Sequence, residues 1–181
     1  MKVLVLTGSP RKRGNSNYLA EQFVKGAMEA GHDVFVFDCA HHKVGGCMAC
    51  NHCFKHGDCV QKDDFEQVVP HLLEADVVVF ITPIYYFAAS AQLKAVIDRF
   101  YGPFNGKNAD PAKIYGKKAV LITTMGQSTT EVAEPTIGMY CQILSFHRWE
   151  DAGELHAAGF VVTDTASPYP QLAYELGKNL K

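Results

Sequence analysis

The chain has 181 residues, of which 48% are hydrophobic and 20% are charged, a composition ordinary for one globular domain with a substantial core. Its formal net charge of -2 provides no basic field, so neither nucleic acid nor a membrane surface is expected as a partner. The sequence contains no recognisable signal peptide and no apolar run of about 18 residues, so we expect a cytoplasmic protein without a membrane span.

The first part of the chain alternates between strand and helix patterns. KVLVLT, residues 2–7, is continuously apolar and predicts a buried strand. Residues 16–31 carry a helical apolar stripe, with Asn15 or Ser16 as candidate N-cap and Gly31 as the end. DVFVFD, residues 33–38, predicts a second strand, and a cysteine-rich loop at about 39–61 follows it.

The same alternation continues to the end of the chain. An amphipathic helix is predicted over 62–76, where Pro70 should kink it or start it afresh. Residues 102–118 are the expected irregular insertion, and Pro135 should weaken a helix over 128–146. The other predicted elements are strands at 77–82, 117–126 and 149–159, and helices at 90–102 and 169–181.

Continuously apolar strands that alternate with helices predict an α/β fold, with a parallel sheet covered by helices on both faces. We expect a single domain over residues 1–181, in which Cys39 and Cys141 are buried thiols and Trp149 belongs to the core or an interface. Ligands of such sheets bind beyond the carboxyl ends of the strands, where the strand order reverses. The loops that follow the strands are therefore the places to search for a site.

The loop TGSPRKRGNSN, residues 7–17, runs from the first strand into a helix N-terminus. Free backbone N–H groups and the helix dipole favour an anion at such a position. Ser9, Ser16 and Asn17 add polar side chains, and Arg11 can make a charge-assisted contact with phosphate. The alternative is a polar, capped turn without ligand. The loop has neither GxGxxG nor a Walker A sequence, so it predicts a phosphate site of another kind.

The loop after the third strand is aromatic, with Tyr85, Tyr86 and Phe87 in succession. Aromatic side chains beside an anion site favour a large planar ligand, because rings stack with offset geometry. An ordinary hydrophobic corner is the alternative. TTMGQSTT, residues 123–130, adds a polar loop at the same predicted edge. Together the loops predict a site for a mononucleotide with a flat ring system.

The segments LTGSPRKRGNSNYLAE, KDDFEQVVPHLLEADVVVFITPIYYFAASAQLKAVIDR and TTMGQ resemble the NADPH-dependent FMN reductase branch of the flavodoxin-like superfamily. The resemblance covers about residues 1–160. It implies a flavodoxin-like three-layer sandwich whose five-stranded parallel sheet has the order 2-1-3-4-5. It also implies bound FMN, with NAD(P)H as a co-substrate that delivers hydride to flavin N5. No catalytic acid or base is expected, because the flavin carries the chemistry.

Carried over by position, the resemblance implies three groups of FMN-binding residues. Members of the family often have YFGS where this chain has Tyr86 to Ala89, so one glycine is missing. The phosphate group would be held by Ser9, Arg11, Asn15, Ser16 and Asn17. The ring would be lined by Pro83, Ile84, Tyr85, Tyr86 and Phe87, and the pocket closed by Thr123, Thr124, Met125 and Gly126.

Four cysteines lie within thirteen residues, at Cys47, Cys50, Cys53 and Cys59. The spacing C-x2-C-x2-C-x5-C suits a [4Fe–4S] cluster, whereas zinc sites more often use two separated C-x2-C pairs. The iron–sulfur flavoprotein branch of the superfamily has a compact run of this kind, and GDCVQKDD resembles it. A cluster here is expected near the flavin. Zinc, disulfides and a cysteine-rich loop without cofactor stay open.

The expected function is that of an FMN-dependent oxidoreductase. It would transfer reducing equivalents from NAD(P)H or a reduced carrier to a flavin, a quinone or an electron carrier. Its partner would be a small-molecule or protein electron acceptor, and the resemblance implies a homodimer or homotetramer. Two alternatives stay open: a non-enzymatic electron-transfer relay that contains the cluster, and a zinc-binding regulatory module.

Overall fold

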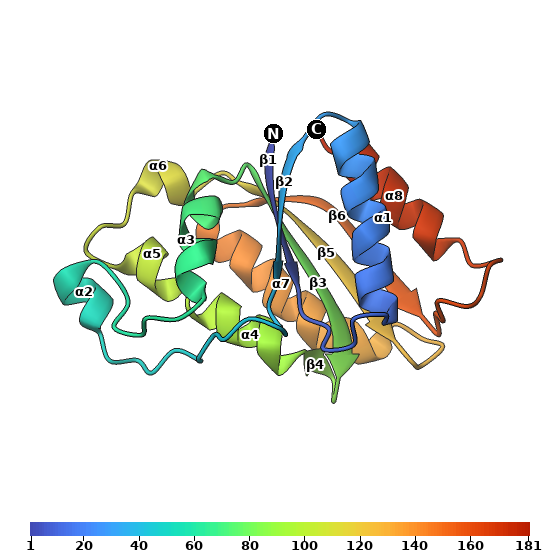
Figure 1. Cartoon of the computed structure of the whole chain (residues 1–181), viewed down its shortest axis with the longest axis horizontal. Coiled ribbons are helices and arrows are strands. Elements are labelled where there is room, and N and C mark those ends of the chain that lie inside the picture. Colours follow the sequence, from blue (N-terminus) through green and yellow to red (C-terminus); the bar gives the residue numbers. More distant parts are fainter.

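A parallel sheet forms the centre of the fold (Figure 1). The computed structural model describes residues 1–181. The strands follow the order β2-β1-β3-β5-β6, and the short β4 pairs antiparallel with the end of β3. With β4 set aside, this is the order 2-1-3-4-5 that we expected. The strands are β1 (Lys2–Thr7), β2 (Asp33–Asp38), β3 (Val77–Tyr85), β4 (Ala88–Ala89), β5 (Lys118–Met125) and β6 (Glu150–Ala158).

Helices cover both faces of the sheet, which completes the three-layer sandwich (Figure 1). One face is covered by α1 (Asn15–Glu29) and α8 (Tyr169–Lys178), which pack against each other. The other face is covered by α3 (Phe65–Glu74), α4 (Ala91–Asp98) and α7 (Glu134–His147). The short helices are α2 (His52–His56), α5 (Tyr101–Asn105), α6 (Pro111–Ile114) and the 3-10 turn η1 (Glu131–Ala133).

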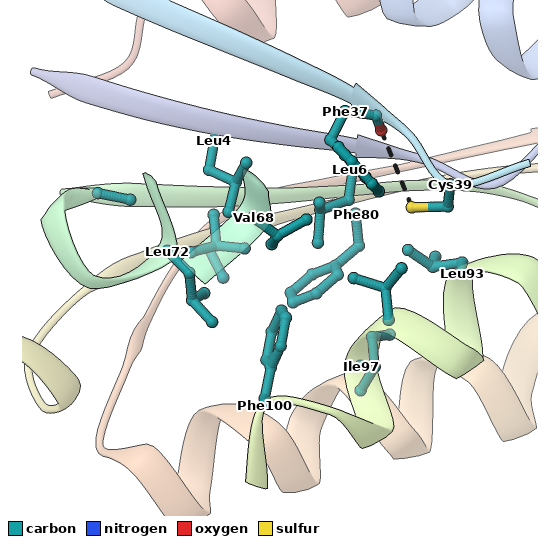
Figure 2. Packing of buried hydrophobic residues seen from close by; sticks show 14 of the residues in the cluster. Leu4, Leu6, Phe37, Cys39, Val68, Leu72, Phe80, Leu93, Ile97 and Phe100 are labelled. Atoms are coloured by element: carbon teal, nitrogen blue, oxygen red, sulfur yellow. Dashed lines mark hydrogen bonds between the residues drawn. The ribbon is translucent and has the colours of Figure 1, made fainter. Parts of the chain in front are cut away.

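The apolar strand sequences explain why both faces are covered. Successive side chains of a strand point to opposite faces, so Val3 and Val5 lie in one core and Leu4 and Leu6 in the other. Figure 2 shows the second core, in which side chains of β1 and β3 meet those of α3 and α4. The labelled residues there include Leu6, Phe80, Val68, Leu72, Leu93 and Ile97.

Several local expectations need correction. Pro70 lies inside α3, which continues through it and does not start afresh there; its missing N–H leaves the carbonyl of Glu66, an exposed residue, without an intrahelical donor. Pro135 lies in the first turn of α7, where its missing N–H costs nothing, so it helps begin the helix. The α1 helix is capped by Gly14 and by neither Asn15 nor Ser16. Residues 102–118 contain α5 and α6.

The two cysteines outside the cysteine-rich run differ in environment. Cys39 is buried, and its thiol lies 3.8 Å from the carbonyl oxygen of Phe37 (Figure 2). Burial raises the pKa of this thiol, which suits a buried, inert cysteine. Cys141 is exposed on α7, so the expectation that it is buried was wrong. Trp149 belongs to the core and donates a hydrogen bond to Ile114, as expected. No helix has both the length and the apolar character needed to cross a bilayer.

Candidate functional site

The loop between β1 and α1 and the carboxyl ends of β3 and β5 surround a cavity of about 400 Å³. These strands are neighbours in a parallel sheet, so their carboxyl ends meet at one edge. Three segments that are distant in sequence therefore contribute to one wall. The residues that line the cavity are Ser9, Arg11, Arg13, Gly14, Asn15, Ser16, Pro83, Ile84, Tyr85, Thr124, Met125 and Gly126.

The β1–α1 loop gives one end of this cavity a positive character. Arg11 and Arg13 both line it, and the first turn of α1 carries no acidic side chain. The first N–H groups of a helix have no intrahelical acceptor and point toward such a cavity. At Gly14 a Cβ would lie 3.0 Å from the carbonyl oxygen of Arg11, so a larger residue would crowd the loop. Sequence reasoning missed Arg13 and Gly14, although both belong to the same motif.

Polar side chains of the first turn of α1 are already engaged within the protein. Ser16 Oγ lies 2.7 Å from Thr124 Oγ1, which ties α1 to β5. The amide of Asn15 donates to the carbonyl oxygen of Phe160 at 2.6 Å and accepts from the N–H of Val162 at 3.0 Å. These two bonds hold the chain beyond β6 against α1. Asn15 lines the cavity, but its side-chain amide is already hydrogen-bonded to Phe160 and Val162.

Two further residues shape the β1–α1 loop. Asn17 does not line the cavity, and its amide donates to the carbonyl oxygen of Arg11 at 3.1 Å. Ser9 is buried, and its hydroxyl accepts from the N–H of Arg11 at 3.3 Å. Both bonds hold the backbone on either side of Arg11. The loop is therefore organised before any ligand arrives, which reduces the entropy lost on binding.

The aromatic loop contributes one of its three rings to the cavity. Tyr85 lines it, whereas Tyr86 and Phe87 do not and are 96% and 56% exposed. Tyr86 and Phe87 have positive φ values of 49° and 69°, a left-handed turn that costs energy for non-glycine residues. This turn lets β4 fold back and pair with the end of β3. The two outer rings therefore project away from the protein.

The start of α4 locks the aromatic loop to the β1 loop. Ser90 caps α4 by accepting from the N–H of Leu93, as its position in the sequence predicts, and its own N–H donates to Thr82 Oγ1 at 3.0 Å. Gly8 lies against this corner, where a Cβ would approach Ser90 Oγ to 2.5 Å. The residue after β1 must therefore be a glycine for the two loops to close over one cavity.

Neighbouring threonines at the end of β5 have different roles. Thr124 faces the cavity, together with Met125 and Gly126. Thr123 points to the opposite face, where its hydroxyl lies 2.8 Å from His156 Nδ1. His156 Nε2 in turn lies 2.9 Å from Glu154, which completes a chain of three polar side chains on β5 and β6. Sequence patterns did not predict this hydrogen-bonded series, because Thr123 and His156 become neighbours only through the pairing of β5 with β6.

The four clustered cysteines lie elsewhere on the molecule. They line one small cavity of about 30 Å³, together with Arg99 and Tyr101. It shares no residue with the larger cavity, and α2, which carries Cys53, packs against α5, far from the start of α1 (Figure 1). The expected closeness of the cysteine site to the other cavity is therefore absent within one chain.

The cysteine cavity has the donor types of a soft-metal site. All four thiols are free, two of them exposed and two half-buried, and they surround one space. Yet no three cysteine, histidine or carboxylate side chains lie close enough together to hold a metal ion. Ala49, Asn51 and Gly57 in this segment have positive φ values. The donor set fits a cluster in its chemistry, and the thiols would have to turn inward to bind one.

The fold and the large cavity define a flavodoxin-like α/β protein. A sequence model of the family described as NADPH-dependent FMN reductase matches residues 1–146, and the chain belongs to that family. Among curated relatives, an iron–sulfur flavoprotein of Archaeoglobus fulgidus is 32% identical over 127 residues, which cover 70% of this chain and 57% of that protein. An iron–sulfur flavoprotein of Methanocaldococcus jannaschii is 33% identical over 99 residues, which cover 55% and 51%. The chain thus spans about half the length of the curated relatives that it matches.

Solved structures support the fold assignment. The NAD(P)H:quinone oxidoreductase from Methanothermobacter marburgensis superposes with a TM-score of 0.79 at 22% identity, covering 99% of this chain and 95% of that chain. The FMN-dependent NADH-azoreductase from Bacillus anthracis, solved in complex with FMN, has a TM-score of 0.70 at 16% identity, covering 98% and 96%. At these identities the comparison establishes a shared architecture.

Proposed function

We propose that this chain is an FMN-dependent oxidoreductase that passes reducing equivalents from NAD(P)H or a reduced carrier to a flavin, a quinone or an electron carrier. The observation that carries the proposal is a single cavity with a cationic, N–H-rich end beside Arg11 and an apolar, aromatic end beside Tyr85. A flavin mononucleotide has the matching shape, with a phosphate at one end and a planar ring at the other. FMN, when bound, supplies the hydride chemistry.

The proposed roles follow from which residues line the cavity and from the hydrogen bonds that their side chains already make. Arg11, Arg13 and the N-terminal N–H groups of α1 would hold the phosphate, with Ser9 and Ser16 in support. Asn15 would contribute through its backbone N–H, because its amide is bonded to Phe160 and Val162. The ring would lie against Pro83, Ile84 and Tyr85, and Thr124, Met125 and Gly126 would close the pocket.

A comparison of FMN with riboflavin tests the phosphate end. Arg11→Ala should weaken FMN binding by about 1.5–3 kcal/mol, the value of a charge-assisted hydrogen bond, and leave riboflavin nearly unchanged. Lys12→Ala is the matched control, because Lys12 is an exposed cation of the same loop that does not line the cavity. An equal loss of both ligands in Arg11→Ala would exclude Arg11 from the phosphate site.

Kinetics distinguish the enzyme from an electron relay. The FMN-loaded chain should oxidise NADPH or NADH faster than free FMN does, and a quinone should sustain turnover. Reduction by a reduced carrier, with no reaction toward either nicotinamide nucleotide, would favour the non-enzymatic relay. Zinc bound without FMN would favour the regulatory module. Each outcome can be followed by flavin absorbance and by metal analysis of the same sample.

We further propose that Cys47, Cys50, Cys53 and Cys59 hold a [4Fe–4S] cluster. Support comes from their spacing and from the one cavity that all four line. Anaerobic reconstitution should yield about four irons per chain. One zinc per chain, or no metal at all, would contradict the cluster and leave the FMN proposal standing. In a reducing cytoplasm, where we place the chain, these thiols would stay reduced.

We also propose a homodimer or homotetramer of one-domain chains. Tyr86 and Phe87 are exposed aromatic residues beside the cavity, and aromatic residues are enriched at subunit interfaces. Light scattering of the FMN-loaded protein measures the assembly directly, and a monomer at micromolar concentration would contradict this part of the proposal.

A further inference from the structure

One buried arginine joins the two ends of the cysteine-rich loop. Arg99, the C-cap residue that follows α4, has a side chain only 2% exposed. Its Nη1 donates to the carbonyl oxygen of Gly45 at 2.9 Å, and its Nη2 approaches that of Gln61 at 3.4 Å. Gly45 lies two residues before Cys47, and Gln61 lies two residues after Cys59. The guanidinium thus spans the base of the loop that carries all four cysteines.

Asp63 completes this contact and keeps the arginine in place. Its carboxylate accepts from Arg99 Nη1 at 3.0 Å and from Nη2 at 3.3 Å, and it also accepts from the N–H of Gly45 at 3.0 Å. Although burial disfavours the charged form, the hydrogen bonds from Arg99 hold the pKa of Asp63 below its usual range. We call Arg99 and Asp63 the clasp, because their hydrogen bonds hold the two ends of loop 45–61 together.

The far side of the loop is held independently. The carbonyl oxygen of Cys53 accepts from the N–H of Lys107 at 3.0 Å, and the ring of Phe54 packs on Tyr101 with centroids 5.6 Å apart. Because these contacts come from α5 and the residues after it, the cysteine loop is fixed at its tip as well as at its base. All four cysteines line one small cavity in the segment between these attachments.

Arg99 also keeps one donor unused. Its Nε is buried and has no hydrogen-bond partner, while the side chain lines the cavity that the cysteines surround. A buried N–H of a charged group without an acceptor is costly, so its retention needs an explanation. Cysteine sulfur bound to a metal is anionic and accepts hydrogen bonds, and a buried cation nearby offsets the charge of several thiolates.

We propose that Arg99 is the positioning residue of the cysteine site. It holds both ends of loop 45–61 so that the four thiols need only turn inward to reach one centre, and its Nε would donate to a sulfur ligand of that centre. The inference rests on the proposed thiolate site and is independent of the FMN proposal. Lysine is no substitute, because a single ammonium cannot hold two carbonyls and a carboxylate with the geometry of a planar fork.

Cobalt(II) is the probe for this role, because thiolate ligation to Co²⁺ produces charge-transfer absorption whose intensity rises with the number of sulfur ligands. We would titrate the reduced, anaerobic, FMN-loaded protein and three variants, Arg99→Gln, Arg99→Lys and Lys94→Gln. Lys94 is the matched control, an exposed cation on the same helix that pairs with Asp98. FMN affinity, measured on each sample, reports whether the rest of the fold is intact.

Arg99→Gln should bind Co²⁺ about 10- to 100-fold more weakly and with a smaller sulfur signal per bound cobalt, as expected when an outer-shell partner is lost. Arg99→Lys should recover only part of both. FMN affinity should stay within about twofold in all three variants, since the two cavities share no residue. The control should match the parent protein.

Two results would overturn the proposal. One is an Arg99→Gln protein that matches Lys94→Gln in cobalt affinity and in sulfur signal. The other is a parent protein that binds no Co²⁺ through sulfur. If Arg99→Gln does not fold, Asp63→Asn provides the same test, because it removes the carboxylate from the clasp and keeps the guanidinium. A parent protein that binds Co²⁺ but not FMN would refute the proposed function and leave this inference intact.

Discussion

Ser16 Oγ and Thr124 Oγ1 lie 2.7 Å apart in the interior, so one buried hydrogen bond joins the first turn of α1 to the end of β5. Ser16→Ala or Thr124→Val leaves the other hydroxyl unpaired, which should cost about 1–3 kcal/mol of unfolding free energy. The double variant leaves neither hydroxyl unpaired, so it should lose less than the sum of the single variants. Denaturant unfolding of the four proteins measures this coupling, and strictly additive losses would contradict it.

Tyr85 and Tyr86 are adjacent in sequence but should differ in their effect on the flavin. Tyr85 lines the cavity, whereas Tyr86 is 96% exposed. Replacing Tyr85 by Leu removes a stacking contact worth about 0.5–1.5 kcal/mol, so FMN should bind several-fold more weakly and fluoresce more strongly. Tyr86→Leu serves as the control and should change neither property. A larger effect of Tyr86→Leu would mean that the loop turns inward when FMN binds.

The crossing of α1 and α8 depends on two glycines. A Cβ on Gly177 would lie 2.1 Å from the carbonyl oxygen of Phe23, and a Cβ on Gly26 would lie 2.0 Å from that of Tyr174. Gly177→Ala should therefore force the helices apart and cost about 1–3 kcal/mol of unfolding free energy.

Gly138→Ala is the matched control for that helix crossing. Gly138 lies within α7, and a Cβ added there would meet no atom within 4 Å, so alanine should stabilise that helix by about 0.5–1 kcal/mol. Thermal or denaturant unfolding of both variants gives the comparison. Equal effects of the two substitutions would show that α8 adjusts its position without cost.

His147 predicts a pH dependence of stability. It is 9% exposed and packs among Phe104, Phe146 and Trp149, and burial lowers the pKa of its imidazole. Below pH about 6.5 the unfolded chain binds a proton at this residue that the folded chain does not yet bind. Its contribution to stability is therefore complete above that pH and falls as the pH decreases, by at most ~1.4 kcal/mol per pH unit until the folded imidazole is protonated.

His147→Phe keeps a ring in this position and removes the titration. Unfolding free energies measured between pH 7 and pH 5 should decline less steeply for His147→Phe than for the parent protein. All other residues are the same in the two proteins, so their contributions cancel in the difference. Parallel pH profiles for the two proteins would show that His147 is protonated with equal ease in the folded and unfolded chains.

The sequence alone determined the architecture. The runs KVLVLT and VVVFIT are apolar at every position or nearly so, and a strand of that kind is stable only when both of its faces are covered. A parallel sheet with helices on both sides follows, and its carboxyl edge brings together the segments that contain Ser9, Pro83 and Thr124. These are local patterns and connection rules, which a single chain displays without knowledge of its distant contacts.

Tertiary structure alone decided which side chains within those loops face the cavity and which are used elsewhere. Asn15 is bonded to residues 145 and 147 positions away, and the turn at Tyr86 directs a predicted ring contact away from the protein. Arg99 is hydrogen-bonded to Gly45 and Asp63, which lie 54 and 36 positions away, and the residues next to Arg99 in the sequence do not indicate these bonds. A hydrogen bond or a close approach depends on where the whole backbone places two groups, so spacing along the chain cannot predict it.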